Sequence, residues 1–279
     1  MYVDSFYTLF FFILLNLLIF RYHKNISQIY NVFDLPNEKR KIHKQIVPLT
    51  GGLILIVNIL ILYPVFKPDN LFVAPLFFLI IFFIGYLDDK FNISASLKLL
   101  IIFTFVIVHA LLDQNILINN LRFNYFETFY LDGIFQYLFL AFCIASFVNA
   151  LNMFDGANLQ VSIYSIFIFI VLYLNTLNVF YFYLTIPLIF FSVLNYKNLS
   201  FLGDSGSILI GYLISYEIIK NYNQSNIFTC EDIFLLMFLP GIDMARLFIY
   251  RILKNKNPLK ADNLHIHHLL LNKLTFKIS

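Results

Sequence analysis

The sequence of 279 residues is poor in charge, contains no tryptophan and has only two cysteines. Charged side chains make up 13% of it and hydrophobic ones 60%, and its mean hydropathy is +0.80. This shortage of charge excludes an ordinary soluble domain and favours a membrane protein. Cys143 and Cys230 lie far apart in the chain, which argues against a disulfide framework and against a cysteine-based metal site. The sequence also has no internal repeat and no low-complexity tract.

Long apolar runs are abundant instead. A helix that spans a bilayer needs about 20 apolar residues. Nine runs approach that length: 5–20, 49–66, 71–87, 97–112, 134–151, 159–174, 177–194, 205–221 and 231–253. Because the runs are continuous rather than alternating, we expect helices and not a β-barrel. We therefore predict one all-α integral-membrane domain over residues 1–279, with about nine transmembrane helices.

The distribution of basic residues predicts how these helices are oriented. All 19 lysines and arginines except Lys67, Arg122 and Lys220 lie on one set of alternating loops. The positive-inside rule places that set in the cytoplasm, so the N-terminus is expected outside and the C-terminus in the cytoplasm. The first run has no basic region before it and no small-residue cleavage site after it, so we expect a retained span. A short extracytoplasmic hairpin is expected within residues 113–133.

Unusual polar residues gather at the predicted cytoplasmic ends of the spans. They form five segments: Asp88 with Asp89, then Lys98, then Asn149, Asn152 and Asp155, then Asp204, and last Arg251 with His265, His267 and His268. Ionisable groups at membrane depth are costly, so their default interpretation is functional. The spacing of three within residues 149–155 keeps those side chains near one helical face. The pattern predicts a site at the boundary between membrane and cytosol.

These residue types suit phosphate chemistry. Carboxylates and amides are oxygen ligands for Mg²⁺, which completes its coordination with water and substrate phosphates. Lysine and arginine at the same boundary would add phosphate contacts. The stretch FLGDSGS at 201–207 is a small-residue turn before a span, and the N-terminus of the following helix favours an anion. Phosphoryl transfer to or from a lipid phosphate is the predicted chemistry.

Five stretches, in order, resemble the motifs of the polyprenyl-phosphate N-acetylhexosamine-1-phosphate transferases, a group within glycosyltransferase family 4. They are DLPNEKRKIHKQIVPLTGG (34–52), LDDKFNISASLKLL (87–100), NALNMFDG (149–156), FLGDSGS (201–207) and DMARLFIYRILKNKNPLKADNLHIHHLLL (243–271). The resemblance implies transfer of a sugar 1-phosphate from a UDP-N-acetylhexosamine to undecaprenyl (polyprenyl) phosphate, with release of UMP. It is closer to the branch that uses GlcNAc 1-phosphate or starts O-antigen synthesis than to phospho-N-acetylmuramoyl-pentapeptide transferase.

The resemblance also implies roles for the acidic and amide residues. Asp204 and Asn152 are the expected ligands of Mg²⁺, which Mn²⁺ could replace. Asp155 is expected to bind the metal or to lie beside the attacking phosphate. Asp88 or Asp89 would deprotonate or orient the lipid phosphate, and repulsion between adjacent carboxylates would favour a raised pKa in one of them. The alternatives are a helix N-cap at Asp204, a helix end at Asp155 and a solvated charged turn at the aspartate pair.

The expected cationic and substrate-binding residues lie in other segments. Lys98 would hold the lipid phosphate, although a lysine that extends to the membrane interface is a serious alternative. Substrate binding is expected from Asn149, Lys98, Arg251, His265, His267 and His268. A zinc site at the three histidines is rejected because no fourth ligand is evident nearby. The simpler interpretation of Arg251 is that it anchors the last span.

The expected partners are undecaprenyl or polyprenyl phosphate, a UDP-N-acetylhexosamine and the lipid bilayer, with no nucleic acid. Members of the family are often dimers, so a homodimer is also considered. The expected location is the bacterial inner (cytoplasmic) membrane, which the chain would cross several times.

Two departures from the family pattern keep rival functions open. Asn92 stands where the family often has a third aspartate, and Asn158 with Leu159 replaces an Asp-Gly pair. A catalytically silent homologue therefore remains an alternative. A phospho-N-acetylmuramoyl-pentapeptide transferase, the other branch of the family, is a further one. A secondary transporter fits less well, because the carboxylates cluster at one predicted face and no repeat is present.

Overall fold

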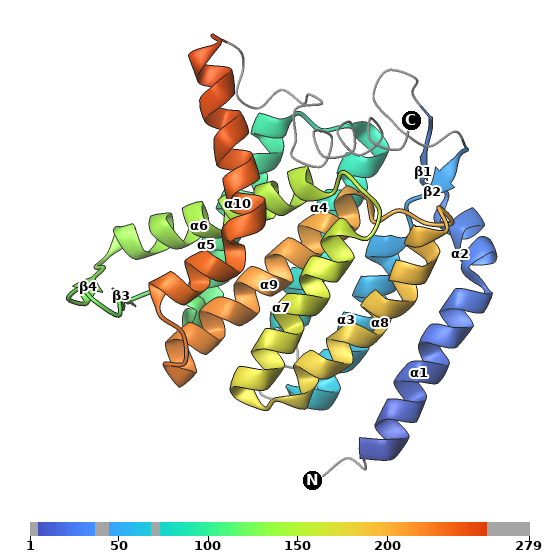
Figure 1. The fold of residues 1–279 in the computed structure, drawn as a ribbon, viewed down its shortest axis with the longest axis horizontal. Coiled ribbons are helices and arrows are strands. Elements are labelled where there is room, and N and C mark those ends of the chain that lie inside the picture. Colours follow the sequence, from blue (N-terminus) through green and yellow to red (C-terminus); the bar gives the residue numbers. More distant parts are fainter. Residues whose placement is uncertain (1–4, 37–44, 68–72, 256–279) are drawn as a thin grey trace, which may run out of the picture. The chain divides into compact units, whose positions relative to one another are not determined.

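The computed structural model describes residues 5–36, 45–67 and 73–255 and is almost entirely helical (Figure 1). The prediction of an all-α protein is confirmed. Its helices are α1 (Ser5–Arg21), α2 (His23–Tyr30), α3 (Gly51–Phe66), α4 (Val73–Phe91), α5 (Ala95–Leu112), α6 (Ile134–Phe154), α7 (Gln160–Thr176), α8 (Val179–Tyr196), α9 (Gly203–Ser225) and α10 (Cys230–Leu253). Each of the nine apolar runs thus lies largely within one helix. The helix α2, within what was expected to be a loop, was not predicted.

Short strand pairs interrupt the helices at two places. The first pair joins β1 (Phe33–Asp34) to β2 (Val47–Pro48), and the second joins β3 (Asn120–Leu121) to β4 (Phe129–Tyr130). Both pairs are antiparallel. The second pair lies between α5 and α6, after the 3-10 turn η2 (Gln114–Ile116), so the hairpin expected within residues 113–133 is confirmed as a hairpin.

Several of these helices have the dimensions of membrane spans. Within the described residues, α5, α6, α8 and α10 are long and apolar enough to cross a bilayer. The α1 and α2 helices together would make a fifth, although they are bent by 68° at the break between them, and α3 and α7 are apolar but shorter. The chain is therefore a multi-pass membrane protein, whereas nine crossings and the orientation of the termini stay predictions.

The chain divides into two compact units, and the first is built from Met1–Asn92 and Val161–Ile210. In this unit α8 packs against α1 and α3, and α3 packs against α4. Aromatic rings fill the centre: the ring of Tyr63 lies 5.1 Å from that of Phe78 and 5.2 Å from that of Phe180, between centroids. All three rings are buried. These edge and tilted contacts are the arrangements that aromatic side chains favour.

The second unit comprises Ile93–Gln160 and Gly211–Ser279, and in it α6 packs against both α5 and α10. A buried polar group joins α5 to α9. His109 hydrogen-bonds the Tyr212 hydroxyl and stacks on the Tyr216 ring, and Tyr216 donates to Asp113 at 2.9 Å. The pKa of Asp113 lies below its ordinary value. Burial acts to raise it, but the hydrogen bonds from Asn115 and Tyr216 have the larger combined effect. The carboxylate is thus held in its charged form at the end of α5.

Asparagine ends many of the helices in this glycine-poor chain. Five asparagines that follow helices have a positive φ, close to 50°: Asn31, Asn92, Asn198, Asn226 and Asn255. Apart from glycine, asparagine is among the residues that adopt this left-handed conformation most readily. The chain has only nine glycines, and asparagine occupies the left-handed position after these five helices.

A pair of buried amides connects α1 to α3. Asn16 donates to the Asn58 side-chain oxygen at 2.8 Å, and Asn58 donates back at 3.2 Å. Each amide also donates to the carbonyl four residues earlier in its own helix, at 2.9 Å. Both side chains are fully buried among apolar residues, where an amide without partners would be costly. The pair therefore fixes the register of α1 on α3.

We expect a double-mutant cycle on this pair to give positive coupling. Asn16→Leu leaves Asn58 with its cross-helix partner removed, so it should destabilise the protein, and Asn58→Leu in the same chain should restore part of the loss. The coupling should be about 0.6 kcal/mol, the average for hydrogen bonds between membrane helices, and at most about 1.7 kcal/mol. Reversible unfolding in mixed micelles would measure it. Asn175→Leu, at an exposed asparagine with the same bond to its own helix, is the control. Additive losses would contradict the prediction.

Candidate functional site

The aspartate pair meets the start of α9 in the first unit. The two oxygens of Asp89, in the last turn of α4, accept hydrogen bonds from the backbone N–H groups of Asp204 at 2.7 Å and Ser205 at 2.9 Å. The first N–H groups of a helix have no partner within the helix, and they favour a negative charge. The sequence predicted an anion at this helix N-terminus, and the structure places the carboxylate of Asp89 there.

Small residues make this contact possible. An added Cβ at Gly85 would lie 2.5 Å from the Ser205 Cα and 2.6 Å from the Asp204 carbonyl oxygen, so the backbones of α4 and α9 touch there. Gly203 has φ of +73°, and a Cβ on it would lie 2.9 Å from an oxygen of Asp89. A residue with a side chain would be strained at this φ and would displace the carboxylate. The glycines before and opposite Asp204 thus set its position.

This packing determines the pKa of Asp89. Burial is the largest influence on Asp89 and the nearby charge of Asp204 the second, and together they raise the pKa of Asp89 to about 7, against the hydrogen bonds from residues 204 and 205. Asp89 lies beyond the predicted span of 71–87. Its neighbour Asp88 is buried and Asp204 is partly exposed. A raised pKa was expected from repulsion between Asp88 and Asp89, whereas at Asp89 it arises from burial and from the charge of Asp204.

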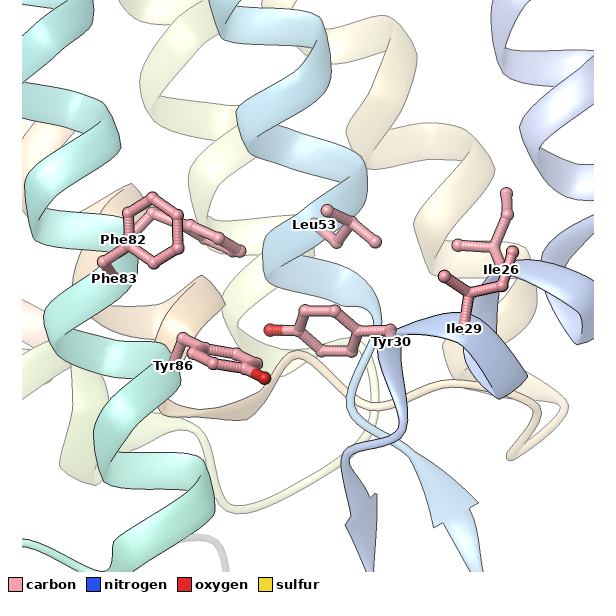
Figure 2. Close-up of a pocket in the computed structure, with 7 residues that line it drawn as sticks. All are labelled: Ile26, Ile29, Tyr30, Leu53, Phe82, Phe83 and Tyr86. Carbon is pink, nitrogen blue, oxygen red and sulfur yellow. The ribbon is translucent and has the colours of Figure 1, made fainter.

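An apolar pocket lies next to this group. Its volume is about 540 Å³, and it is lined by Ile26, Ile29, Tyr30, Leu53, Phe82, Phe83 and Tyr86. Figure 2 shows the two isoleucines on one side and the α4 side chains Phe82, Phe83 and Tyr86 on the other. The Tyr30 hydroxyl donates to the Ser205 hydroxyl at 3.5 Å, so the polar edge of the pocket touches the start of α9. Sequence reasoning missed this pocket because α2 was expected to be a loop.

In the second unit the structure brings Lys98 and Asn152 together. The Lys98 ammonium, in the first turn of α5, donates to the side-chain oxygen of Asn152 at 3.1 Å. Lys98 is buried rather than exposed on the surface of its unit. The two residues were predicted for separate roles, as phosphate contact and metal ligand. The hydrogen bond makes them one group.

The side chains of residues 149, 152 and 155 have different surroundings. The Asn149 amide lies 3.5 Å from the sulfur atoms of Met153 and Met244, on the side of α6 that meets α10. Asn152 instead faces Lys98 on α5. Asp155 is the C-cap of α6 and is partly exposed. The first two residues therefore meet different neighbouring helices rather than one common partner, and the helix ends before the third.

The last helix of the second unit carries a buried arginine and an ion pair. Arg251 is 2% exposed, in the final turn of α10, which does not fit a simple anchor at the membrane surface. Asp243, also buried, accepts a hydrogen bond from Arg246 at 2.9 Å. Asp243 was not predicted as a site residue, although it opens the motif at 243–271. The predicted His265, His267 and His268 lie outside the described residues.

Two of the departures from the family pattern have conformational consequences. Asn92 follows the end of α4 with φ of 52°, so an asparagine there suits the left-handed backbone. Leu159 has φ of 70°, a conformation that is strained for leucine and that the family's glycine would adopt freely. The first substitution therefore fits its position, whereas the second introduces strain next to α7.

We expect Leu159→Gly to stabilise the protein. Removing the Cβ should relieve about 1 kcal/mol of backbone strain, reduced in part by the greater freedom of glycine in the unfolded chain. The midpoint of thermal unfolding in detergent would rise accordingly. Leu159→Ala is the matched control, because it removes most of the side chain and keeps the Cβ, and it should give no gain. An equal rise in both variants would show that the side chain and not φ is responsible.

The donor set fits a hard divalent cation. Mg²⁺ is commonly bound through one or two carboxylates, with water and substrate phosphates completing the shell. Asp204 and Asp89 supply two neighbouring carboxylates in the first unit, and each oxygen of Asp89 has a lone pair beyond its hydrogen bond. Among the described residues, no three His, Cys, Asp or Glu side chains gather as a site made of protein ligands alone. Asp204 and Asp89 alone would therefore be an incomplete set of ligands.

Known proteins resemble this chain along most of its length. A probable undecaprenyl-phosphate N-acetylglucosaminyl 1-phosphate transferase of Bacillus subtilis (strain 168) is 27% identical over 266 residues, which cover 89% of this chain and 72% of the relative. The undecaprenyl-phosphate alpha-N-acetylglucosaminyl 1-phosphate transferase of Escherichia coli (strain K12) is 25% identical over 265 residues, or 89% and 71%. The enzyme of that name from Yersinia pestis is 26% identical over 256 residues, or 85% and 69%.

The model of one protein family matches the middle of the chain. The match covers residues 71–221, which include the aspartate pair at the end of α4, the Lys98–Asn152 contact and the start of α9. These are three of the five segments whose motifs suggested the resemblance, and the match extends over more than half of the sequence. The chain belongs to glycosyl transferase family 4.

Proposed function

We propose that this protein transfers an N-acetylhexosamine 1-phosphate from a UDP-sugar to undecaprenyl (polyprenyl) phosphate. The products are a polyprenyl-diphosphate-linked sugar and UMP, and the reaction starts the synthesis of O-antigen or another cell-surface polysaccharide. The names of the relatives support the lipid acceptor and GlcNAc 1-phosphate. The observation that carries the proposal is the contact between Asp89 and the first N–H groups of α9, which sets Asp204 beside a second carboxylate.

In the proposed reaction an oxygen of the lipid phosphate attacks the β-phosphorus of the UDP-sugar. A new P–O bond forms there, the bond from that phosphorus to the bridging oxygen breaks, and the bridging oxygen leaves with UMP. Asp204 and Asn152 are the proposed ligands of Mg²⁺, and the ion, when bound, would supply positive charge to the diphosphate. Asp88 or Asp89 would accept a proton from the lipid phosphate or orient it. Asp155 would contact the metal or the attacking phosphate.

The cationic residues of the second unit would bind phosphate and nucleotide. Lys98, already buried and bonded to Asn152, would hold the lipid phosphate as a point charge. Asn149, Arg251 and the histidines at 265, 267 and 268 would bind the donor. The apolar pocket beside Tyr30 offers hydrocarbon surface close to Ser205, and it suits a lipid better than a soluble acceptor.

The proposal is tested with membranes that contain the protein, undecaprenyl phosphate, Mg²⁺ and a panel of radiolabelled donors. The panel comprises UDP-GlcNAc, UDP-GalNAc, UDP-FucNAc, UDP-QuiNAc and UDP-N-acetylmuramoyl-pentapeptide. Label in the organic phase with an equal amount of UMP in the aqueous phase is the expected result, and it identifies the sugar. Chelation of Mg²⁺ should abolish it, and Mn²⁺ should restore part of it.

Two results would change the assignment. Label transferred only from the pentapeptide donor would move the protein to the other branch of the family. No transfer from any donor, by protein that is folded and extracted as a single species, would favour the silent homologue. In that case Asn92→Asp and Asn158→Asp, alone and together, are the first variants to assay for gained activity.

A further inference from the structure

The hairpin between α5 and α6 exposes aromatic side chains that the proposed function does not use. Tyr125 is 90% exposed, Phe126 75%, Phe129 60% and Tyr130 68%. All four lie within or just before the strand β4, in a loop of one unit. Exposed aromatic residues gathered in this way usually mark a surface that contacts a partner. The question is which partner covers them.

The polar side of the hairpin is already occupied within its own unit. The Arg122 guanidinium lies 3.9 Å above the ring of Tyr222 and also donates to the Asn226 side chain at 2.5 Å. Asn124 donates through its backbone to Glu231 at 3.0 Å and through its side chain to Thr229 at 3.1 Å. These bonds tie one arm of the hairpin to the end of α9 and the start of α10. The aromatic residues are held in a fixed structure while their side chains stay exposed.

The position of the hairpin indicates the partner. It joins α5 and α6, two consecutive helices that are long and apolar enough to cross a membrane, so it lies at a membrane surface whichever way the chain is oriented. Exposed apolar residues continue from it into the adjoining span: Ile134 and Phe135 begin α6, and Phe142 follows two turns later. Exposed apolar residues therefore follow one another in the sequence from the hairpin into the start of a helix that is long and apolar enough to cross a membrane.

The chemistry of the surface favours lipid over water. Phenylalanine and tyrosine combine an apolar ring with, in tyrosine, a hydroxyl that prefers water, and tyrosine is enriched where membrane meets water. The charged groups in the loop after Arg122 are Glu127 and Asp132, so attraction to anionic headgroups is not expected. Binding would come from insertion of the rings.

We propose that this hairpin inserts its aromatic residues, Tyr125, Phe126, Phe129 and Tyr130, into the interfacial layer of the bilayer. The rings would enter the boundary between headgroups and acyl chains, to a depth of about 5–10 Å. The hairpin would thereby fix the depth of α5 and α6, to which it is joined at both ends. Because no basic residue is exposed among the four rings, salt should not weaken the interaction.

The absence of tryptophan makes a direct test simple. Phe126→Trp, and separately Tyr125→Trp, would give the protein a single tryptophan, whose emission can be excited selectively in liposomes of neutral lipid. We expect emission at shorter wavelength than in water, strong quenching by lipids brominated near the headgroup and weak quenching by iodide. Phe142→Trp, on the exposed face of α6, is the control, and it should be quenched best by lipids brominated near the chain end.

The proposal would be overturned by either of two results. Strong quenching by iodide, without quenching by brominated lipid, would place the hairpin in water. Protection from both quenchers, lost as the protein is diluted in lipid, would mean that a second copy covers the rings. Circular dichroism and gel filtration of each variant establish that it is folded, and two independent tryptophan positions prevent one misfolded variant from deciding the outcome.

Discussion

Asp204→Asn is expected to lower the rate of sugar-phosphate transfer by at least about 1,000-fold. The substitution keeps the size of the side chain and removes the charge that would hold the divalent cation. A bound cation stabilises charge in such reactions by several kcal/mol, and about 4 kcal/mol corresponds to three powers of ten in rate. The initial rate at saturating donor and acceptor, measured across a titration with Mg²⁺, would show the loss and any shift in the Mg²⁺ requirement.

A matched control separates this effect from a general change of charge. Asp132→Asn removes the same charge from an exposed position in the loop before α6, and it should leave the rate unchanged. The thermal midpoints of both variants should stay close to that of the parent protein. A near-normal rate for Asp204→Asn at all Mg²⁺ concentrations would remove Asp204 from the metal site.

Gly85→Ala is expected to disrupt the same site although it substitutes no charged residue. The added methyl group would lie 2.5 Å from the Ser205 Cα and 2.6 Å from the Asp204 carbonyl oxygen, so α4 and α9 must move apart. Overpacking of this kind destabilises a protein by about 1–3 kcal/mol. A displacement of about 1 Å at a catalytic group can lower a rate about 100-fold. We therefore expect both a lower thermal midpoint and a loss of transfer.

Gly241→Ala provides the comparison for this variant. It makes the same change inside α10, where an added Cβ meets no atom within 4 Å. Alanine favours a helix over glycine by about 1 kcal/mol, so this variant should be as stable as the parent or more so. If Gly85→Ala were equally harmless, the close approach of α4 to α9 would not be a requirement of the site.

The fold was largely predictable because each long apolar run predicts one helix. Each of the nine runs is a helix, since a segment in lipid must satisfy its backbone hydrogen bonds internally. The bend after α1 was not predictable, because residues 21–48 are polar enough to look like one loop. The Asn16–Asn58 pair was missed for a related reason: a single asparagine within an apolar run gives no sign of the asparagine that it meets 42 residues later.

The candidate site was predictable in its residue types but not in its contacts. Asp89 and Asp204 were both selected, yet as a proton acceptor and a metal ligand. Nothing local in the sequence shows that the carboxylate of Asp89 binds the helix N-terminus that begins at residue 203. The same holds for Lys98 and Asn152, which were chosen separately and are bonded to each other. The spacing of a motif predicts which residues share a face of one helix. These contacts join different helices, so they depend on how the helices pack.

The bond from Asp204 to Asp89 also sets an order of events during synthesis of the protein. The two residues are 115 positions apart, and the first unit is interrupted by the whole of residues 93–160. At a translation rate of about 5–20 residues per second, the ribosome needs roughly 6–23 s to travel from one to the other. During that interval α4 is complete while Asp89 awaits the amides that it will bind. The nascent chain therefore carries an incomplete site while four further helices, α5 to α8, are synthesised.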